Sequence, residues 1–380
     1  MAVVREGGVK VPVTAGLVVE EKGIMDPESY GRSGQVFGLP VKLYWAGFVA
    51  LATIMLMIVE YMETPGLVPG IQFEDLFIFK LLGYANLLLI ASTILYVAHL
   101  WFTSESVGRW ASGLAGLGAA ASLFALAWRW IEVFWLHRPG HFAMNTLYEM
   151  VALFSTLTVV IYLVMERVYR TRSAGAFVMM IVLAAIIFQI WLASHETAIP
   201  GSHTRILRAY WMYAHVLGSF FGYGAFAIAA AMGAAYLICS RSQGLGALVR
   251  TTGIRLPAAR RIERLMHRAV MMGFPVFALA TALGAIWAYE AWGRYWAWDP
   301  KETWALLVSL IYAGYFFFHY VNGWKGPRMA WWNIVGFATT VFCFVGVRVL
   351  WPGVHETVPM VTQVDGSATW LAAMMFLVMP

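Results

Sequence analysis

The chain has 380 residues, of which 61% are hydrophobic and 12% are charged, and its mean hydropathy is +0.70. This composition excludes a soluble globular protein, in which about a quarter of the residues are charged. The formal net charge of +6 is expected to serve membrane insertion and contact with the anionic lipid of the bilayer, and nothing in the sequence predicts a nucleic-acid partner.

The first 40 residues combine glycine, proline and mixed charge, and they lack the apolar core of a signal peptide. We therefore predict that residues 1–40 form a cytoplasmic N-terminal tail. Residues 41–380 are predicted to form one helical transmembrane domain.

Nine segments of that domain are long enough to cross a bilayer as helices, because about 20 apolar residues span its hydrocarbon. A tenth apolar run, residues 368–380, is short and is expected at the interface or as an incomplete last helix. Strand-like alternation is absent, so the predicted fold class is all-α, a polytopic membrane helix bundle of about nine or ten transmembrane helices. The expected spans are residues 42–61, 78–101, 110–135, 145–166, 174–194, 209–239, 267–290, 303–320 and 329–350.

The distribution of lysine and arginine predicts the orientation of this bundle. With the N-terminus inside, the inner segments hold 18 of the 26 basic residues and the outer segments hold 7, with Lys80 inside the second span. Cytoplasmic loops carry such an excess, so we expect a cytoplasmic N-terminus. The inner loop 240–266 has room for a short amphipathic helix, and the loop near residues 287–304 is placed outside.

That outer loop includes the sequence WGRYWAWDPKETW at residues 292–304. Trp292, Trp296 and Trp298 offer large apolar faces, and Arg294 and Lys301 are suited to pair with carboxylates at the edge of a ligand. Haem combines an apolar plane, two propionates and an iron that accepts imidazole. The alternative is an aromatic belt at the membrane interface, which outer loops commonly have.

Other residue patterns argue against several classes of site. The two cysteines, Cys239 and Cys343, lie far apart and form no C-x-x-C pair, so both are expected to be small buried side chains. No H-x-x-x-H or C-x-x-C favours zinc, and no G-x-S-x-G favours a serine hydrolase. Six of the nine histidines fall near the predicted outer face, which suits a flat cofactor held from separate helices.

Residues 292–306, WGRYWAWDPKETWAL, resemble the WWD signature of the CcsA/ResC cytochrome c biogenesis proteins. Further similar blocks bring the resemblance to roughly residues 140–356, and the first 130 residues lie outside it. These blocks are HFAMNTLYE at 141–149, YWMYAHV at 210–216, GFPVFALATALGAIWAYEAWG at 273–293 and GFATTVFCFVGVRVLWPGVH at 336–355.

The resemblance implies a subunit of a holocytochrome c synthase, or haem lyase. With a CcsB/ResB partner, such a subunit moves haem b from the cytoplasmic side to the outer face of the bacterial cytoplasmic membrane, or its thylakoid equivalent, and presents it to apocytochrome c. In the family, two outer histidines flank the WWD loop and ligate the iron, and these match His215 and His355.

The same resemblance assigns roles within the loop. The platform for haem is formed by Trp292, Trp296 and Trp298, while Asp299 and Glu302 shape the loop or the site for the acceptor. This sequence departs from the family near the end of the similar region, where Arg348 replaces a common Asn and GVHET replaces the usual GLHSY.

A third haem ligand is implied near the inner face. The family places a histidine 18 residues after the WWD aspartate, where this chain has Phe317, and His319 follows two residues later. Two residues turn a side chain by about 200° on a straight helix. Either an irregularity in the helix restores the direction of the His319 side chain, or the haem site uses another face of the helix. His99 and His267 also lie near the inner face and can supply a second ligand, although the resemblance assigns that ligand to the partner subunit.

Three alternative functions remain open. A haem exporter or chaperone of the shorter WWD type shares the platform and both outer histidines, but it generally lacks the continuation Pro300-Lys301-Glu302. A quinol-linked cytochrome b pairs histidines about 13 or 14 residues apart, a pattern missing here. A purely structural assembly subunit would bind no haem.

Overall fold

The computed structural model describes residues 35–36, 39–40, 73–102, 104–136, 146–195, 210–240 and 258–351. The chain divides into two compact units, Met1–Ile58 and Val59–Pro380. In the first unit, the described residues form one short antiparallel pairing between β1 (Gln35–Val36) and β2 (Leu39–Pro40). The expected span 42–61, the run 368–380 and most of the tail 1–40 lie outside the described residues.

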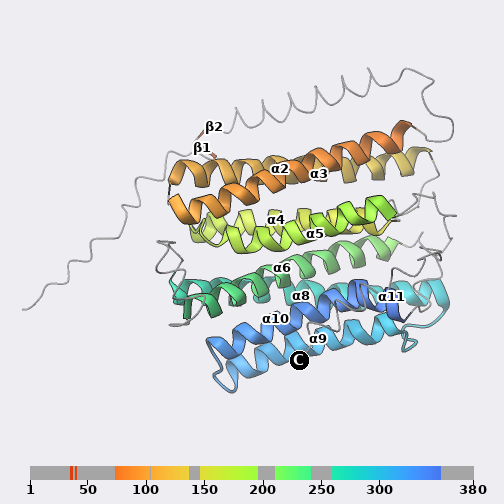
Figure 1. Ribbon diagram of the computed structural model, residues 1–380. Helices are drawn as coiled ribbons and strands as arrows, with labels where there is room; N and C mark the ends of the chain where they lie inside the picture. The colour runs from red at the N-terminus through yellow and green to blue at the C-terminus, as the bar shows by residue number, and fades with distance from the viewer. Residues whose placement is uncertain are drawn as a thin grey trace, which may run out of the picture. The chain divides into compact units, whose positions relative to one another are not determined.

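The described part of the second unit is entirely helical (Figure 1). Eight of its segments are long and apolar enough to cross a membrane, with α10, η3 and α11 forming one of them. They match eight of the nine predicted spans, so the protein is an integral membrane protein with a polytopic helical fold. The elements are α2 (Phe73–Phe102), α3 (Glu105–Leu136), α4 (Leu147–Tyr169), α5 (Gly175–His195), α6 (Tyr210–Ser240), α8 (Ala259–Trp292), α9 (Pro300–Tyr320), α10 (Pro327–Val341), the π-helix η3 (Phe342–Gly346) and α11 (Val347–Leu350).

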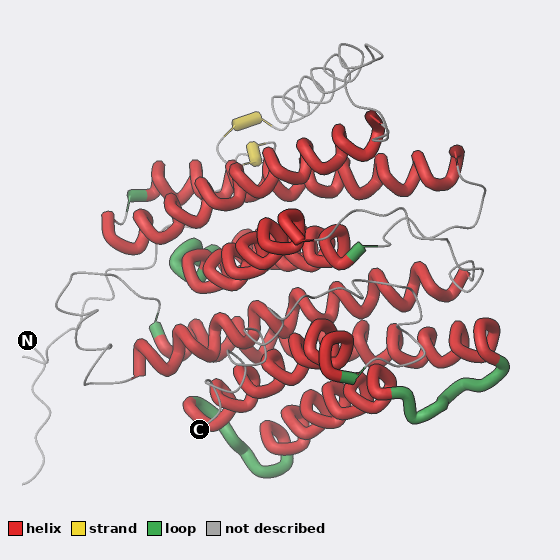
Figure 2. Tube along the Cα trace, turned by 45° about the vertical axis from the view of Figure 1, so that its right-hand side comes forward, coloured by secondary structure: helices red, strands yellow, loops and turns green. Residues whose placement is uncertain are grey.

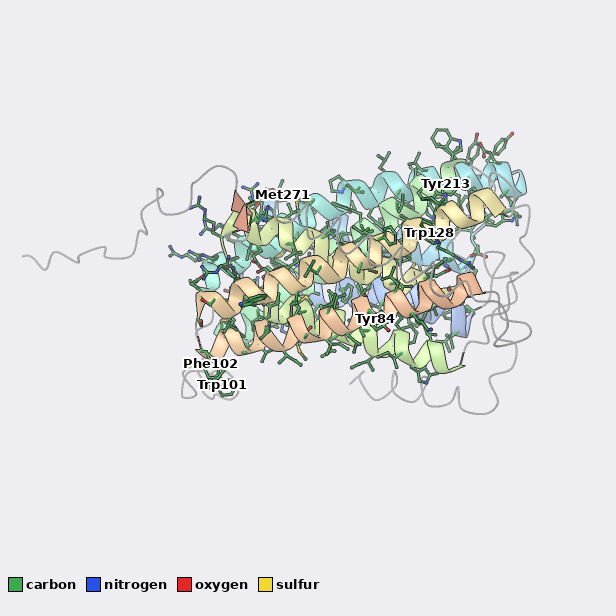
Figure 3. The ribbon with its side chains drawn as sticks, turned by 90° about the horizontal axis from the view of Figure 1, so that it is seen from above. Tyr84, Trp101, Phe102, Trp128, Tyr213 and Met271 are labelled. Carbon is green, nitrogen blue, oxygen red and sulfur yellow. The ribbon has the colours of Figure 1, made fainter. Side chains whose placement is uncertain are left out.

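The helices pack as successive pairs, α2 with α3, α4 with α5, and α6 with α8, while α10 contacts both α6 and α9. Successive described helices run in opposite directions (Figure 2). The loop between α8 and α9 defines the end that we call the WWD end, and the loops after α2, α4 and α9 lie at the opposite end. Figure 3 shows Trp101 and Phe102 toward the opposite end and Trp128 and Tyr213 toward the WWD end.

Helix α6 lies among α4, α8 and α10 because glycines along its length allow a close approach. A Cβ added at Gly222 would lie 2.7 Å from the Cβ of Phe277 on α8, and one at Gly233 would lie 2.8 Å from the Ala330 carbonyl oxygen on α10. Small residues replace the hydrophobic effect as a basis for helix association in lipid, since they increase van der Waals contact. This packing positions α6 and α8 around the site described below.

A buried carboxylate joins α2, α3 and α4 near the opposite end. Glu166 accepts a hydrogen bond at Oε2 from Tyr96 Oη at 2.6 Å and one at Oε1 from Ser112 Oγ, and Arg172 Nε lies 3.4 Å from the same Oε1. An ionised group within a membrane protein is stable only with such partners. The contact therefore holds α2 and α3, which precede the region of family resemblance, against α4.

Helix α8 departs from its predicted bounds and begins at Ala259, eight residues before the expected span 267–290. The charged end of the predicted loop 240–266 is helical, because Ile262, Leu265 and Met266 recur at helical spacing and are buried on one face of α8. Pro275 lies inside the helix, where the missing N–H leaves the Met271 carbonyl without its usual helical donor.

Candidate functional site

The D-P-K-E part of the WWD sequence forms the start of α9. The Asp299 carboxylate accepts a hydrogen bond from the Lys301 N–H at 2.9 Å, and Pro300 occupies the first helical position. The Glu302 carboxylate accepts bonds from the Ala297 and Asp299 N–H groups at 2.7 and 3.3 Å. This capping box fixes the chain that precedes α9, which we call the WWD loop (residues 293–299).

The three tryptophans of the predicted platform face different surroundings. Trp296 lines a cavity, while Trp292 packs edge-on against Trp287 at 4.9 Å between ring centroids. Trp298 is 71% exposed and adopts φ 58°, the left-handed region that costs a non-glycine residue about 1–2 kcal/mol. The rings of Trp296 and Trp298 are nearly perpendicular. Because Trp296 lines the cavity and Trp298 is exposed, the loop presents one indole inward and one outward.

The cavity at this end, which we call the WWD cavity, is formed by α6, α8, α9, η3 and the WWD loop. Its interior of about 80 Å³ is large enough to hold water, which requires about 10–15 Å³ of such space. The lining residues are His215, Ser219, Tyr223, Phe277, Thr281, Gly284, Ala285, Trp287, Ala288, Tyr295, Trp296, Lys301, Glu302, Ala305 and Cys343.

His215 has a defined tautomer in this cavity. Its Nδ1 lies 2.7 Å from the Ala280 carbonyl oxygen of α8, and a carbonyl oxygen only accepts, so Nδ1 carries the proton. Nε2 is therefore the ring nitrogen that can bind a metal when the imidazole is neutral. The ring occupies space left by Gly284, where an added Cβ would lie 2.5 Å from Nδ1.

The structure brings His215, Trp296 and Lys301 to the same cavity, as well as Glu302. Arg294 is exposed on the WWD loop. Asp299 is buried at the helix cap and does not line the cavity. His355, the other predicted outer ligand, lies outside the described residues.

Sequence reasoning did not assign Gly284, Tyr223 or Cys343 to the site. The spacing of Ala280 and Gly284, four residues apart on α8, was a usable signal of a small-residue face toward another helix. Cys343 is buried, as predicted, and it lies in the π-helix η3, from which it lines the cavity. The same prediction is wrong for Cys239, which is half-buried.

At the opposite end, the rings of His267 and His319 stack with centroids 4.3 Å apart. His319 Nδ1 donates to the Trp324 carbonyl oxygen at 3.1 Å, which leaves the lone pair on Nε2. The two nitrogens of His267 each lie 3.1 Å from a tyrosine hydroxyl, those of Tyr315 and Tyr320.

The displaced position of His319 has no compensating irregularity in its own helix. Helix α9 is α-helical from Pro300 to Tyr320, and the π-helical turn of this region lies in the next span. His319 therefore uses a different face of α9 from Phe317, which is 53% exposed. His99 bonds to the Ser104 carbonyl oxygen between α2 and α3.

No group of three or more His, Cys, Asp and Glu side chains able to hold a metal ion occurs among the described residues. The described histidines therefore offer ligands singly or as a pair.

Comparison with known proteins gives the family. The sequence profile described as "Cytochrome C assembly protein" matches residues 144–355. The cytochrome c biogenesis protein CcsA of Synechococcus elongatus is 28% identical over 288 residues, covering 65% of this chain and 87% of the relative. CcsA of Synechococcus sp. strain RCC307 is 28% identical over 313 residues, covering 76% and 97%.

A solved structure with a similar fold is the Cytochrome c Heme Lyase CcmF. It matches with a TM-score of 0.55 at 15% identity, over 83% of this chain and 51% of CcmF, so the chain spans about half the length of that protein. At this identity the likeness concerns the fold alone. Because the family profile covers more than half of the sequence, the chain belongs to the cytochrome c assembly protein family, and its role lies in cytochrome c biogenesis.

Proposed function

We propose that this protein carries haem b to the WWD end and presents it there to apocytochrome c. In this proposal it is the CcsA-type subunit of a holocytochrome c synthase and acts with a CcsB/ResB-type membrane partner. The observation that carries the proposal is the convergence of His215, Trp296 and Lys301 on one cavity. Family membership and the P-K-E continuation of the WWD sequence support it.

His215 is the first axial ligand in this proposal. Its Nδ1–H bond to the Ala280 carbonyl oxygen orients the ring, and Nε2 is the coordinating atom in this proposal. His355 is the second ligand, from the opposite face of the haem. In the sequence it follows the end of α11, at Leu350, by five residues.

Polar groups in the cavity suit the haem propionates. Trp296 Nε1 is buried without a hydrogen-bond acceptor among the described residues, and an unsatisfied buried donor costs free energy until an acceptor arrives. Lys301 adds a positive charge to the same wall, while Arg294 is exposed on the loop. Trp292 and Trp298 extend the aromatic surface beside the cavity.

The chemical step requires little from side chains other than positioning. The S–H of an acceptor cysteine adds across a haem vinyl group, so that a C–S bond forms, the hydrogen goes to the other vinyl carbon, and nothing leaves. Holding thiol and vinyl in contact replaces a bimolecular encounter. Asp299 and Glu302 contribute by fixing the WWD loop beside that position.

We further propose that His319 holds haem at the opposite end before transfer. Axial ligands bind iron from opposite sides of the macrocycle, whereas His267 and His319 stack face to face. His267 therefore supports the His319 ring, and the second ligand is expected from the partner subunit.

The proposed orientation places the N-terminus, the tail 1–40 and the opposite end in the cytoplasm. The WWD loop then lies on the outer side of the bacterial cytoplasmic membrane, or its thylakoid equivalent. Most described basic residues near helix ends lie at the opposite end, among them Arg109, Arg167, Arg170, Arg172, Arg260, Arg261, Arg264, Lys325 and Arg328, which supports this orientation.

The central test replaces His215 by Gly in cells that also express the partner subunit and a reporter apocytochrome c. We expect holocytochrome c to fall below detection and to recover in part when free imidazole is added, because imidazole fills the vacated ligand position. The readouts are haem-stained reporter and the visible spectrum of the purified complex. Ser219→Ala in the same cavity is the control, and a normal yield from His215→Gly would refute the assignment.

A further inference from the structure

The first turns of α8 carry a dense set of cations at the opposite end. Within nine residues the helix has Arg260, Arg261, Arg264 and Arg268, and all four are exposed. At 100° per residue they occupy an arc of about 100°, while the buried residues Ile262, Leu265, Met266 and Ala269 lie on the other side. We call this arc the arginine stripe (Arg260, Arg261, Arg264 and Arg268).

The stripe is not neutralised by the described part of the protein. No ion pair or hydrogen bond joins any of its four side chains to another described residue. The acid in this stretch, Glu263, instead accepts a hydrogen bond from the Gly326 N–H at 2.7 Å before α10. Each pair of arginines four residues apart is therefore repulsive.

The four arginines of the stripe do not stabilise the start of α8. Cations near the start of a helix oppose its dipole, and the residue before α8, Ala258, makes no side-chain cap. The arrangement destabilises α8 unless an anion is bound along the stripe.

The neighbouring helix shows the depth of the stripe in the bilayer. Helix α9 has 21 residues, a length of about 32 Å that matches the hydrocarbon thickness of about 30 Å. Tyr320 at its end bonds to His267 of α8, so residues 259–266 continue past the end of α9. At about 1.5 Å per residue, Arg264 and Arg260 lie about 4 and 10 Å beyond that level, in the headgroup layer.

We propose that the arginine stripe binds the phosphate groups of anionic phospholipids in the leaflet at this end. Guanidinium groups pair with phosphate oxygens through two parallel hydrogen bonds, which a lipid phosphodiester accepts at this depth. Arg328, whose guanidinium carbon lies 5.4 Å from the Trp324 ring centre, follows by two residues Gly326, whose N–H bonds to Glu263 of α8. Lipid bound here fixes the start of α8 next to the His267 ring, and the proposal is independent of the haem function.

The test compares the full protein in nanodiscs of dioleoylphosphatidylcholine with and without dioleoylphosphatidylglycerol. Native mass spectrometry counts retained phosphatidylglycerol, and the melting temperature is measured in parallel. We expect retention by the wild type and a loss of affinity of about fivefold for Arg264→Gln, as each arginine near an anionic surface contributes about that factor. Replacing the whole stripe by Gln should abolish retention, and replacing it by Lys should preserve part of it.

The matched control also removes four positive charges, but from other positions at this end, namely Arg109, Arg167, Arg170 and Lys325. This control should retain phosphatidylglycerol as the wild type does. Equal loss in the control and in the stripe variant, or an unchanged affinity of Arg264→Gln, would overturn the proposal. A rise in melting temperature with inorganic phosphate equal to that with phosphatidylglycerol would also overturn it, since the site would then bind a free anion.

Discussion

Gly284 gives the His215 imidazole the space that it occupies between α6 and α8. A methyl group at this position would lie 2.5 Å from Nδ1, a distance that forces the ring or the helices to move. The bond from Nδ1 to the Ala280 carbonyl oxygen would be displaced with it. The orientation of the proposed haem ligand thus depends on a residue without a side chain.

We predict that Gly284→Ala lowers both stability and haem content. Overpacking should cost about 1–3 kcal/mol, measured by thermal unfolding, and co-purified haem should fall with it. The control is Gly113→Ala in α3, where an added Cβ meets nothing within 4 Å, and where alanine should instead stabilise the helix by about 1 kcal/mol. Equal haem content in the two variants would contradict this account of His215.

His319→Ala tests the proposed inner ligand. In the assembled complex it should reduce co-purified haem more than His99→Ala does, because the His319 Nε2 lone pair is left available by the bond to Trp324. His267→Ala should have an intermediate effect through loss of ring stacking. The pyridine haemochrome assay measures haem content, and an unchanged value in His319→Ala would show that this histidine is no ligand.

At the scale of elements, the capping box links the start of α9 to the WWD loop. Glu302→Ala removes the acceptor for two backbone N–H groups and should cost about 1–2 kcal/mol. We expect faster proteolysis within residues 293–299, a change in tryptophan fluorescence and a lower holocytochrome c yield. Glu290→Ala, an exposed carboxylate near the end of α8, is the control and should behave as the wild type.

Element types followed from the sequence because a span requires a long apolar run, and each of the eight described helices has one. The start of α8 was misplaced, since its arginines lower hydropathy although Ile262 and Leu265 keep a helical period. The extent of the resemblance, residues 140–356, agrees with the family match at 144–355. Contacts such as Cys343 with the WWD cavity, or His267 with His319, depend on the tertiary packing of separate helices, which single-sequence patterns do not encode.

At the scale of the whole molecule, orientation can be tested with introduced cysteines. In a Cys239→Ser background, Arg294→Cys should react with a membrane-impermeant maleimide on intact spheroplasts, because residue 294 is exposed on the WWD loop. Asn322→Cys, exposed between α9 and α10, should react only after permeabilisation. The native Cys343 is buried and should contribute no background. The reverse labelling pattern would place the WWD loop in the cytoplasm.

Pro275 divides α8 between the two histidine sites, since His267 precedes it and Gly284 follows it. A helix bends most easily where a hydrogen bond is already missing, so α8 acts mechanically as two rods joined at this residue. A bend of about 10° would shift Gly284, about 13 Å further along, sideways by about 2 Å. Because Gly284 packs against the His215 ring and His267 packs against the His319 ring, a bend at Pro275 would change both contacts together.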